Sequence, residues 1–308
     1  TDAVTLLGGF NYLRERAESY RFSDDRWGPS ESVFPKRFAD SKGYFVEARV
    51  VWFEELVTTG SFRIEDHSNF GTQDTWKVDA VYHAGPWGTK LRSAYGTGFK
   101  APSLYQLYAP ADPWFGGGNA SLKPETSSSY EFGVEQPLWK DSLTTGLTYF
   151  NSHFANLIDA QYHPDTWLTD PYANIGKARS FGFELPLTYT YSDRLRVKGS
   201  YTWTDTENLD NHRELLRRAK NKIGLNIDCY PADKIKLRWD TVYYGSRYDS
   251  GYQKLKGYSK TDFNIAYQAT PQMEIYVRFE NLFAAKYEEA KNYGTPGFGV
   301  FGGVKLKY

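Results

Sequence analysis

The last nine residues read Val300-Phe301-Gly302-Gly303-Val304-Lys305-Leu306-Lys307-Tyr308. Successive side chains of an extended strand point to opposite faces, so Val304 and Leu306 share one face while Lys305 and Lys307 share the other. This period of two predicts a strand with one apolar face and one polar face, closed by the aromatic Tyr308. An ordinary amphipathic strand of a soluble sheet would show the same pattern. The rest of the chain has to distinguish the two.

The same alternation recurs along the chain. Leu195 and Val197, for example, alternate with Arg196 and Lys198. A period of two indicates strands, because helices repeat every 3.6 residues. Fourteen runs follow this pattern, at 4–22, 42–54, 57–68, 74–84, 89–99, 128–138, 142–158, 173–191, 195–207, 220–230, 234–246, 257–269, 272–283 and 297–308.

The connections between these runs alternate in length as well. Tight turns are expected near 54–55, 85–88, 139–141, 192–194, 231–233 and 270–272. Longer polar segments lie at 23–40, 100–127, 159–172, 207–220, 245–256 and 284–297, and 68–74 is a short exception. Short periplasmic turns and longer outer loops are typical of outer-membrane barrels.

The sequence therefore predicts an all-β fold, a transmembrane antiparallel up-and-down β-barrel wall of about 14 strands in the bacterial outer membrane. The apolar face would contact lipid and lipopolysaccharide, the charged face would line the lumen, and Tyr308 would lie at the periplasmic end. Lipid-facing positions are expected for Leu195, Val197, Phe279 and Leu306, and lumenal positions for Arg196, Lys198, Arg278 and Lys305.

The composition agrees with a barrel. Aromatic residues make up 18% of the chain, with 25 tyrosines and 9 tryptophans, yet the mean hydropathy is negative. No apolar run approaches the roughly 18 residues that a membrane-spanning helix needs. The formal net charge is zero, so no nucleic-acid partner is expected, because phosphate binding needs a basic excess. Cys229 is the single cysteine and cannot form an internal disulfide.

Several local motifs carry more information than the pattern. They are Tyr95-Gly96-Thr97-Gly98-Phe99-Lys100-Ala101-Pro102, Asn119-Ala120-Ser121-Leu122-Lys123-Pro124-Glu125, Tyr130-Glu131-Phe132-Gly133-Val134-Glu135, Asn156-Leu157-Ile158 and Asn281-Leu282-Phe283. In order and spacing they resemble the barrel signature of TonB-dependent outer-membrane receptors. The resemblance extends over residues 89–308.

Receptors of this family have a 22-stranded barrel blocked by a plug domain, on which a TonB-type energy-coupling protein pulls. The sequence contains no plug-like segment, and its fourteen strands fit the last fourteen of twenty-two. The resemblance thus implies one barrel domain over 1–308, with the plug domain or the first strands on another segment or chain. It also implies uptake of a scarce metal complex, a ferric siderophore or cobalamin. A plugless fourteen-stranded porin and a structural barrel filled by a partner chain remain alternatives.

Candidate ligand residues lie in the loop after the fifth run. They are Tyr105, Tyr108, Asp112, Trp114 and Phe115, followed by Gly116-Gly117-Gly118. Aromatic side chains on a glycine-flexible loop suit the planar face of a metal chelate or corrinoid, and burying one ring contributes about 1.5–3 kcal/mol. An aromatic girdle at the membrane interface explains the same residues equally well.

Enzymatic chemistry has little support in the sequence. His212 lies near Asp205 and Asp210, but no serine or cysteine is placed to act as the nucleophile of a triad. No zinc-type spacing of His and Cys is present. The loop after Lys100 also lacks the histidine that a haem receptor would need as an iron ligand. We therefore predict no catalytic residues, no metal site and no cofactor.

Overall fold

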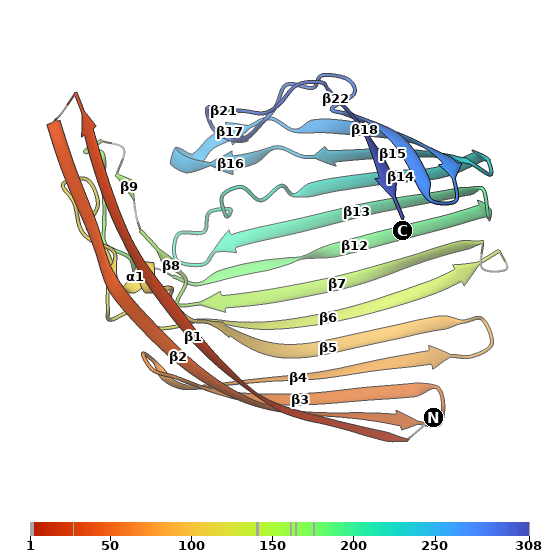
Figure 1. Ribbon diagram of the computed structural model, residues 1–308. Coiled ribbons are helices and arrows are strands. Elements are labelled where there is room, and N and C mark those ends of the chain that lie inside the picture. The colour runs from red at the N-terminus through yellow and green to blue at the C-terminus, as the bar shows by residue number, and fades with distance from the viewer. Residues whose placement is uncertain are drawn as a thin grey trace.

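The computed structural model describes residues 3–26, 28–139, 142–160, 162–163, 165–174 and 176–307. Fourteen strands in these residues form one antiparallel sheet, in which each strand pairs with the next sheet strand along the chain (Figure 1). They are β1 (Val4–Asp25), β2 (Gly28–Trp52), β3 (Leu56–His67), β4 (Gly71–Ala84), β5 (Thr89–Lys100), β6 (Glu125–Leu138), β7 (Leu143–Ala155), β12 (Ala178–Ser192), β13 (Leu195–Asn208), β14 (Asn221–Ala232), β15 (Ile235–Tyr244), β18 (Tyr258–Thr270), β19 (Met273–Glu280) and β22 (Gly299–Leu306). This order confirms the predicted all-β, up-and-down fold.

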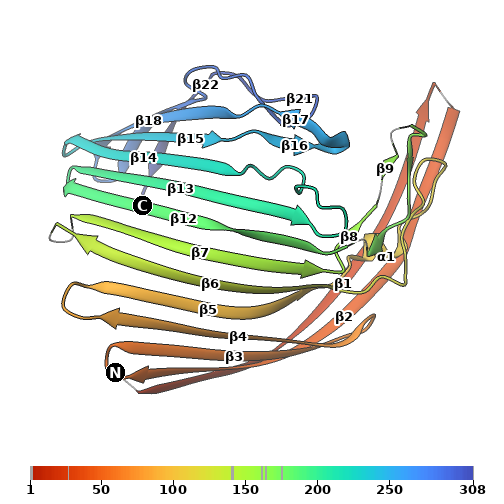
Figure 2. The same cartoon turned by 180° about the vertical axis from the view of Figure 1, so that it is seen from behind.

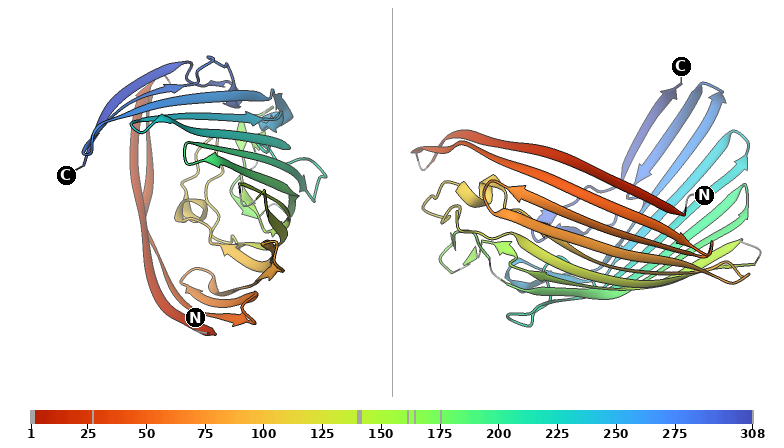
Figure 3. Two further views of the ribbon diagram at one scale, coloured as in Figure 1. Left: turned by 90° about the vertical axis from the view of Figure 1, so that its right-hand side faces the viewer. Right: turned by 90° about the horizontal axis from the view of Figure 1, so that it is seen from below.

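The sheet is strongly curved, and β1 and β22 are its two edge strands (Figure 3). Short elements gather at one end of it (Figures 1 and 2). They are the helices α1 (Leu104–Tyr108) and η1 (Ser250–Tyr252), and the strand pairs β8 (Ile158–Asp159) with β11 (Ala173–Asn174), β9 (Tyr162–His163) with β10 (Leu168–Thr169), β16 (Arg247–Asp249) with β17 (Gln253–Leu255), and β20 (Glu288–Ala290) with β21 (Tyr293–Gly294). Within the described residues, neither helix has the length and apolar character needed to cross a membrane.

Strand pairing gives the sheet two chemically different faces. One row across five strands contains Leu195, Cys229, Leu237, Ile265 and Val277. The adjacent row contains Arg196, Asp228, Arg238, Asn264 and Arg278. Directly paired residues share a face, so the two rows lie on opposite sides of the sheet, which we call the apolar face and the polar face. Val197, Phe279 and Leu306 fall on the apolar face, and Lys198 and Lys305 on the polar face.

The polar face is the inner, concave face. On β2, Ala39 lies on the same side as Glu47 and Arg49, whose partners on β3 continue the polar face. Helix α1 packs against this side, because Leu104 buries itself against Phe34 and Ala39. Figure 3 shows α1 inside the curve of the sheet.

The tight turns lie at one end of the sheet and the long connections at the other, as predicted, and the short connection 68–70 lies at the same end as the long ones. The turns after Ala84 and Ala232 are both at the end that we call the turn end, and the connections 101–124, 209–220, 245–257 and 281–298 are at the other, the loop end (Figure 1). Tyr308, predicted at the periplasmic end, lies outside the described residues.

One predicted loop is wrong. Residues 23–40 were expected to be an irregular loop, but β1 continues to Asp25 and β2 begins at Gly28. Their register runs to Asp25 opposite Gly28, with one irregularity between Ala17 and Ser19. The resulting hairpin extends beyond the rest of the loop end (Figure 1). Outside a bilayer neither face needs to be apolar, so the sequence alternation fades while the backbone hydrogen bonds persist.

Candidate functional site

Helix α1 supports the candidate ligand residues. Ser103 caps it, since its Oγ accepts a hydrogen bond from the Gln106 backbone N–H at 3.2 Å and the Gln106 Oε1 accepts from the Ser103 N–H at 2.9 Å. This reciprocal capping box starts a helix of only five residues. Leu104 and Leu107, on the inner side of the helix, are buried. The cap and the two buried leucines fix the position of the helix, and with it the backbone positions of Tyr105 and Tyr108.

Four aromatic rings from separate parts of the chain meet beside α1. Tyr105 lies 6.0 Å from Phe34 of β2 and 6.4 Å from Tyr172, measured between ring centroids. Phe115 lies 5.5 Å from Tyr172, edge to face. Such tilted and edge-to-face arrangements are the favoured geometries of aromatic pairs. We call Phe34, Tyr105, Phe115 and Tyr172 the loop aromatic cluster.

Arg37 and Tyr108 extend this cluster toward β2. The Arg37 guanidinium carbon lies 4.7 Å from the centroid of the Tyr108 ring. A cation over an aromatic face is attracted by the ring quadrupole. Tyr108 also packs against the buried group of Phe34, Ala39 and Leu104. The contact therefore ties the helix to the projecting hairpin.

Asp112 and Trp114 have different surroundings. The Asp112 Oδ1 accepts hydrogen bonds from the backbone N–H groups of Trp114 at 2.8 Å and Phe115 at 2.9 Å. The Asp112 side chain thus stabilises the turn formed by residues 112–115. The Trp114 side chain is 64% exposed, and in the described part of the chain its ring contacts no other aromatic ring. Trp114 is therefore the most exposed aromatic side chain of the predicted set.

The glycines after Phe115 serve close packing. A Cβ on Gly116 would lie 2.4 Å from the Pro171 Cδ, and one on Gly118 would lie 2.5 Å from the backbone nitrogen of Ala109. Gly117 has a φ of +89°, which side-chain-bearing residues rarely adopt. We expected these glycines to give flexibility, but the structure shows that they let three backbone segments approach one another.

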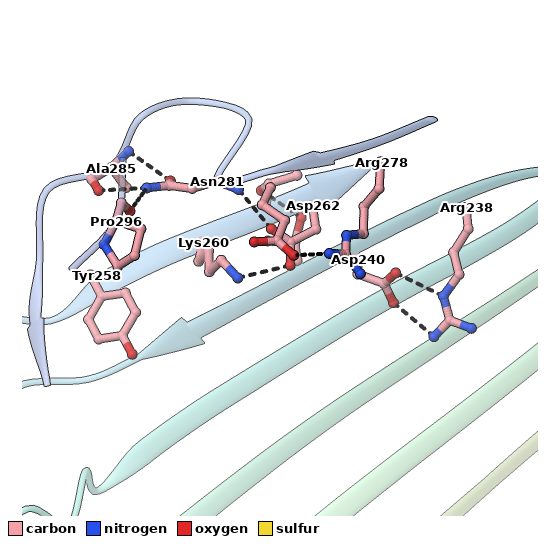
Figure 4. Close-up of polar contacts among 12 residues, drawn as sticks. Arg238, Asp240, Tyr258, Lys260, Asp262, Arg278, Asn281, Ala285 and Pro296 are labelled. Carbon is pink, nitrogen blue, oxygen red and sulfur yellow. Dashed lines mark hydrogen bonds and ion pairs between the residues drawn. The ribbon is translucent and has the colours of Figure 1, made fainter. Parts of the chain in front are cut away.

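Ion pairs cover the polar face near the C-terminal strands. Arg238 pairs with Asp240 at 2.8 Å, Lys260 with Asp262 at 3.0 Å and Arg278 with Glu280 at 2.9 Å (Figure 4). Each pair joins residues two apart on one strand, which share a face. These exposed or half-exposed pairs each contribute little stability.

Asn281 fixes the start of the last long loop. Its backbone N–H donates to Asp262 Oδ1 at 2.8 Å, and its side-chain Nδ2 donates to the carbonyl oxygens of Ala285 and Pro296 (Figure 4). The Asn281 Oδ1 accepts from the Ala285 N–H at 2.9 Å. Asn281 is only 2% exposed, so these partners satisfy a buried amide. The Asn281-Leu282-Phe283 motif thus has a structural role.

Sequence reasoning missed Phe34, Arg37 and Tyr172 as neighbours of the candidate residues. Phe34 and Arg37 lie in the segment that was expected to be an irregular loop, and no local pattern marks Tyr172 as a partner of Phe115. Their proximity depends on the long hairpin and on two connections that meet at the loop end, 101–124 and the one that contains Tyr172. Within the described residues, no group of three or more His, Cys, Asp or Glu side chains is arranged to hold a metal ion.

Comparisons with known proteins identify the family. The family described as TonB dependent receptor-like, beta-barrel matches residues 2–282. The siderophore receptor PirA from Acinetobacter baumannii superposes with a TM-score of 0.78 at 19% identity, over 99% of this chain and 52% of that one. The copper transporter OprC superposes with a TM-score of 0.83 at 16% identity, over 100% of this chain and 55% of that one. The ferric-catecholate import receptor Fiu from K12 E. coli superposes with a TM-score of 0.78 at 14% identity, over 98% of this chain and 52% of that one.

At these identities the structural matches show the shared fold, and the chain spans about half the length of each matched structure. The family match covers most of the chain and agrees with the fourteen-stranded sheet. The chain belongs to the TonB-dependent receptor β-barrel family.

Proposed function

We propose that the chain forms part of the wall of a bacterial outer-membrane receptor that takes up a scarce metal complex, either a ferric siderophore or cobalamin. The family match supports this proposal, and so do the names of the similar structures, which include a siderophore receptor and a ferric-catecholate import receptor. The apolar face would contact lipid and lipopolysaccharide, and the polar face would line the lumen.

The observation that carries the proposal is the position of α1 and its aromatic neighbours. They sit on the polar, concave side at the loop end, where a ligand would enter a barrel (Figure 3). Trp114 and Tyr105 are 64% and 49% exposed, so their rings can cover an apolar, planar surface of a chelate. Tyr108 and Phe115 would complete this surface, and Asp112 would hold the turn that presents it.

Transport would need more than this wall. We propose that residues 1–308 act as one barrel domain, that a plug domain or further barrel strands come from another segment or chain, and that a TonB-type energy-coupling protein acts through the plug. No chemical conversion of the metal complex is part of this proposal, so the protein would act as a transporter and not as an enzyme.

The test is uptake by the intact receptor in outer membranes. Cells that depend on it would be supplied with labelled ferric siderophores or cobalamin, in strains with and without the TonB-type partner. The proposal expects saturable uptake of one such complex, lost without the partner. Equal, non-saturable passage of small solutes in both strains would instead indicate a passive porin and contradict the proposal.

A further inference from the structure

A cavity of about 360 Å³ at the loop end has four cationic side chains among its ten lining residues. Arg217, Arg218, Lys222 and Arg247 contribute to its wall, whereas Glu289 is the single carboxylate among the lining residues. It lies between the ends of β13, β14, β15 and β18, away from α1. It is therefore distinct from the loop aromatic cluster.

Strand register places this cavity on the polar face. Lys222 pairs with Thr202 on one side and with Tyr244 on the other, and Tyr244 pairs with Tyr258. Thr202 lies on the same side of β13 as Arg196 and Lys198, which belong to the polar face. The cavity thus opens toward the concave side of the wall.

Arg247 supplies a buried positive charge beside the cavity. It is 6% exposed, its Nη2 donates to the Glu288 carbonyl oxygen at 2.8 Å, and its guanidinium carbon lies 5.5 Å from the Tyr258 ring centroid. Its Nη1 has no hydrogen-bond partner, and no carboxylate within the described residues pairs with it. A buried guanidinium without a counter-ion is costly. Because Nη1 is closed to solvent, Arg247 would attract an anion in the cavity through its positive charge and would not hydrogen-bond to it directly.

The direct contacts would come from three more accessible cations. The Arg217 Nε donates a hydrogen bond to Asp249, and the Arg217 side chain is 54% exposed. Arg218 and Lys222 are exposed, and neither forms an ion pair with any residue that the structure describes. The Lys222 Nζ lies 5.2 Å from the Tyr244 ring centroid, which holds the ammonium near the cavity. An anion entering here would meet several donors at once.

We propose that this cavity binds an anionic group of the imported metal complex, such as a carboxylate or catecholate. The inference rests on the proposed function, since it assigns a charge class to the ligand. Buried and exposed cations outnumber carboxylates around the cavity, so a neutral complex gains nothing there, whereas an anion compensates the charge of Arg247. Arginine pairs with planar carboxylates and similar oxygen pairs through two parallel hydrogen bonds.

The test compares two double variants of the full chain in detergent. R218Q/K222Q removes two charges from the cavity wall, and K254Q/K256Q removes two charges from the same end of the molecule without touching this wall. The probes are a ferric tricatecholate, a neutral ferric trihydroxamate and inorganic pyrophosphate, measured by titration calorimetry at two salt concentrations.

R218Q/K222Q should bind the tricatecholate and pyrophosphate roughly tenfold more weakly, because hydrogen bonds to charged groups are the stronger ones. K254Q/K256Q should match the wild type, and the trihydroxamate should show no dependence on either change. Equal pyrophosphate binding by wild type and R218Q/K222Q would overturn the inference. If the wild type bound pyrophosphate through this wall but bound neither iron complex, the anion site would stand and its assignment to the imported ligand would fail.

Discussion

Arg217 Nε lies 2.6 Å from Asp249 Oδ1, and this contact joins two loops at the loop end. Asp249 is 1% exposed and also accepts a hydrogen bond from the Lys291 backbone N–H, in a third loop. Burial by itself would raise the pKa of Asp249, but the backbone N–H groups of Lys291 and Ser250 and the Arg217 guanidinium together lower it. One carboxylate therefore holds three long connections together.

Asp249→Asn should loosen these loops without unfolding the sheet. The change keeps the shape but removes the charge, and hydrogen bonds to charged groups contribute about 1.5–3 kcal/mol. Hydrogen exchange in 209–220, 245–257 and 284–297 should become faster, while heat-resistant migration of the barrel stays the same. Asp233→Asn is the matched control, because Asp233 is highly exposed in its pair with Arg194 at the turn end. Equal exchange in both variants would show that Asp249 does not fasten the loops.

Acidification should weaken the same contacts of Asp249 with Arg217 and Lys291. Because the folded-state pKa of Asp249 is lowered, its stabilisation is complete above the ordinary carboxyl pKa of about 3.9 and is lost as pH falls through the folded value. Exchange in the three loops should therefore accelerate below about pH 4, after correction for intrinsic rates. Asp249→Asn should be fast already at neutral pH and show a smaller response. An equal acid response in wild type and variant would assign the effect to other groups.

Gly118→Ala should disrupt the support of the loop aromatic cluster. The added Cβ would lie 2.5 Å from the backbone nitrogens of Tyr108 and Ala109, so the end of α1 would have to move. Near-ultraviolet circular dichroism from the clustered rings should weaken. Gly294→Ala is the control, because a Cβ there meets nothing within 4 Å and its backbone is not in the left-handed region. An unchanged spectrum for Gly118→Ala would mean that the loop accommodates the methyl group.

Trp114→Ala and Phe115→Ala should separate ligand contact from loop structure. Trp114 is exposed and has no ring partner within the described residues, so its removal should weaken binding of the metal complex several-fold while the loop keeps its fold. Phe115 packs edge to face on Tyr172, so its removal should lower both binding and the circular dichroism of the cluster. Equilibrium binding and circular dichroism on both variants distinguish the two effects. Wild-type affinity in Trp114→Ala would remove Trp114 from the ligand site.

The sequence predicted the sheet well because each strand carries its own evidence. Leu195 and Val197 against Arg196 and Lys198 define two faces without reference to any other strand. The hairpin at 23–40 was missed because its pairing depends on the backbone and not on alternation. The candidate site was predicted as a set of aromatics, but Phe34 and Tyr172 could not be added, since contacts between distant loops leave no local signature.

Val277→Arg tests the assignment of the faces. Val277 pairs with Ile265 and Gly302 on the apolar face, so an arginine there would be exposed to lipid near the middle of the wall. The cost at a mid-membrane site is roughly 2–4 kcal/mol. Ser200→Arg adds the same side chain to the polar face, where Ser200 pairs with Pro186 and Gly224. Only Val277→Arg should lower the midpoint of unfolding in lipid vesicles and the yield of inserted, heat-resistant barrel. Equal stability of the two variants would mean that the apolar face does not contact lipid.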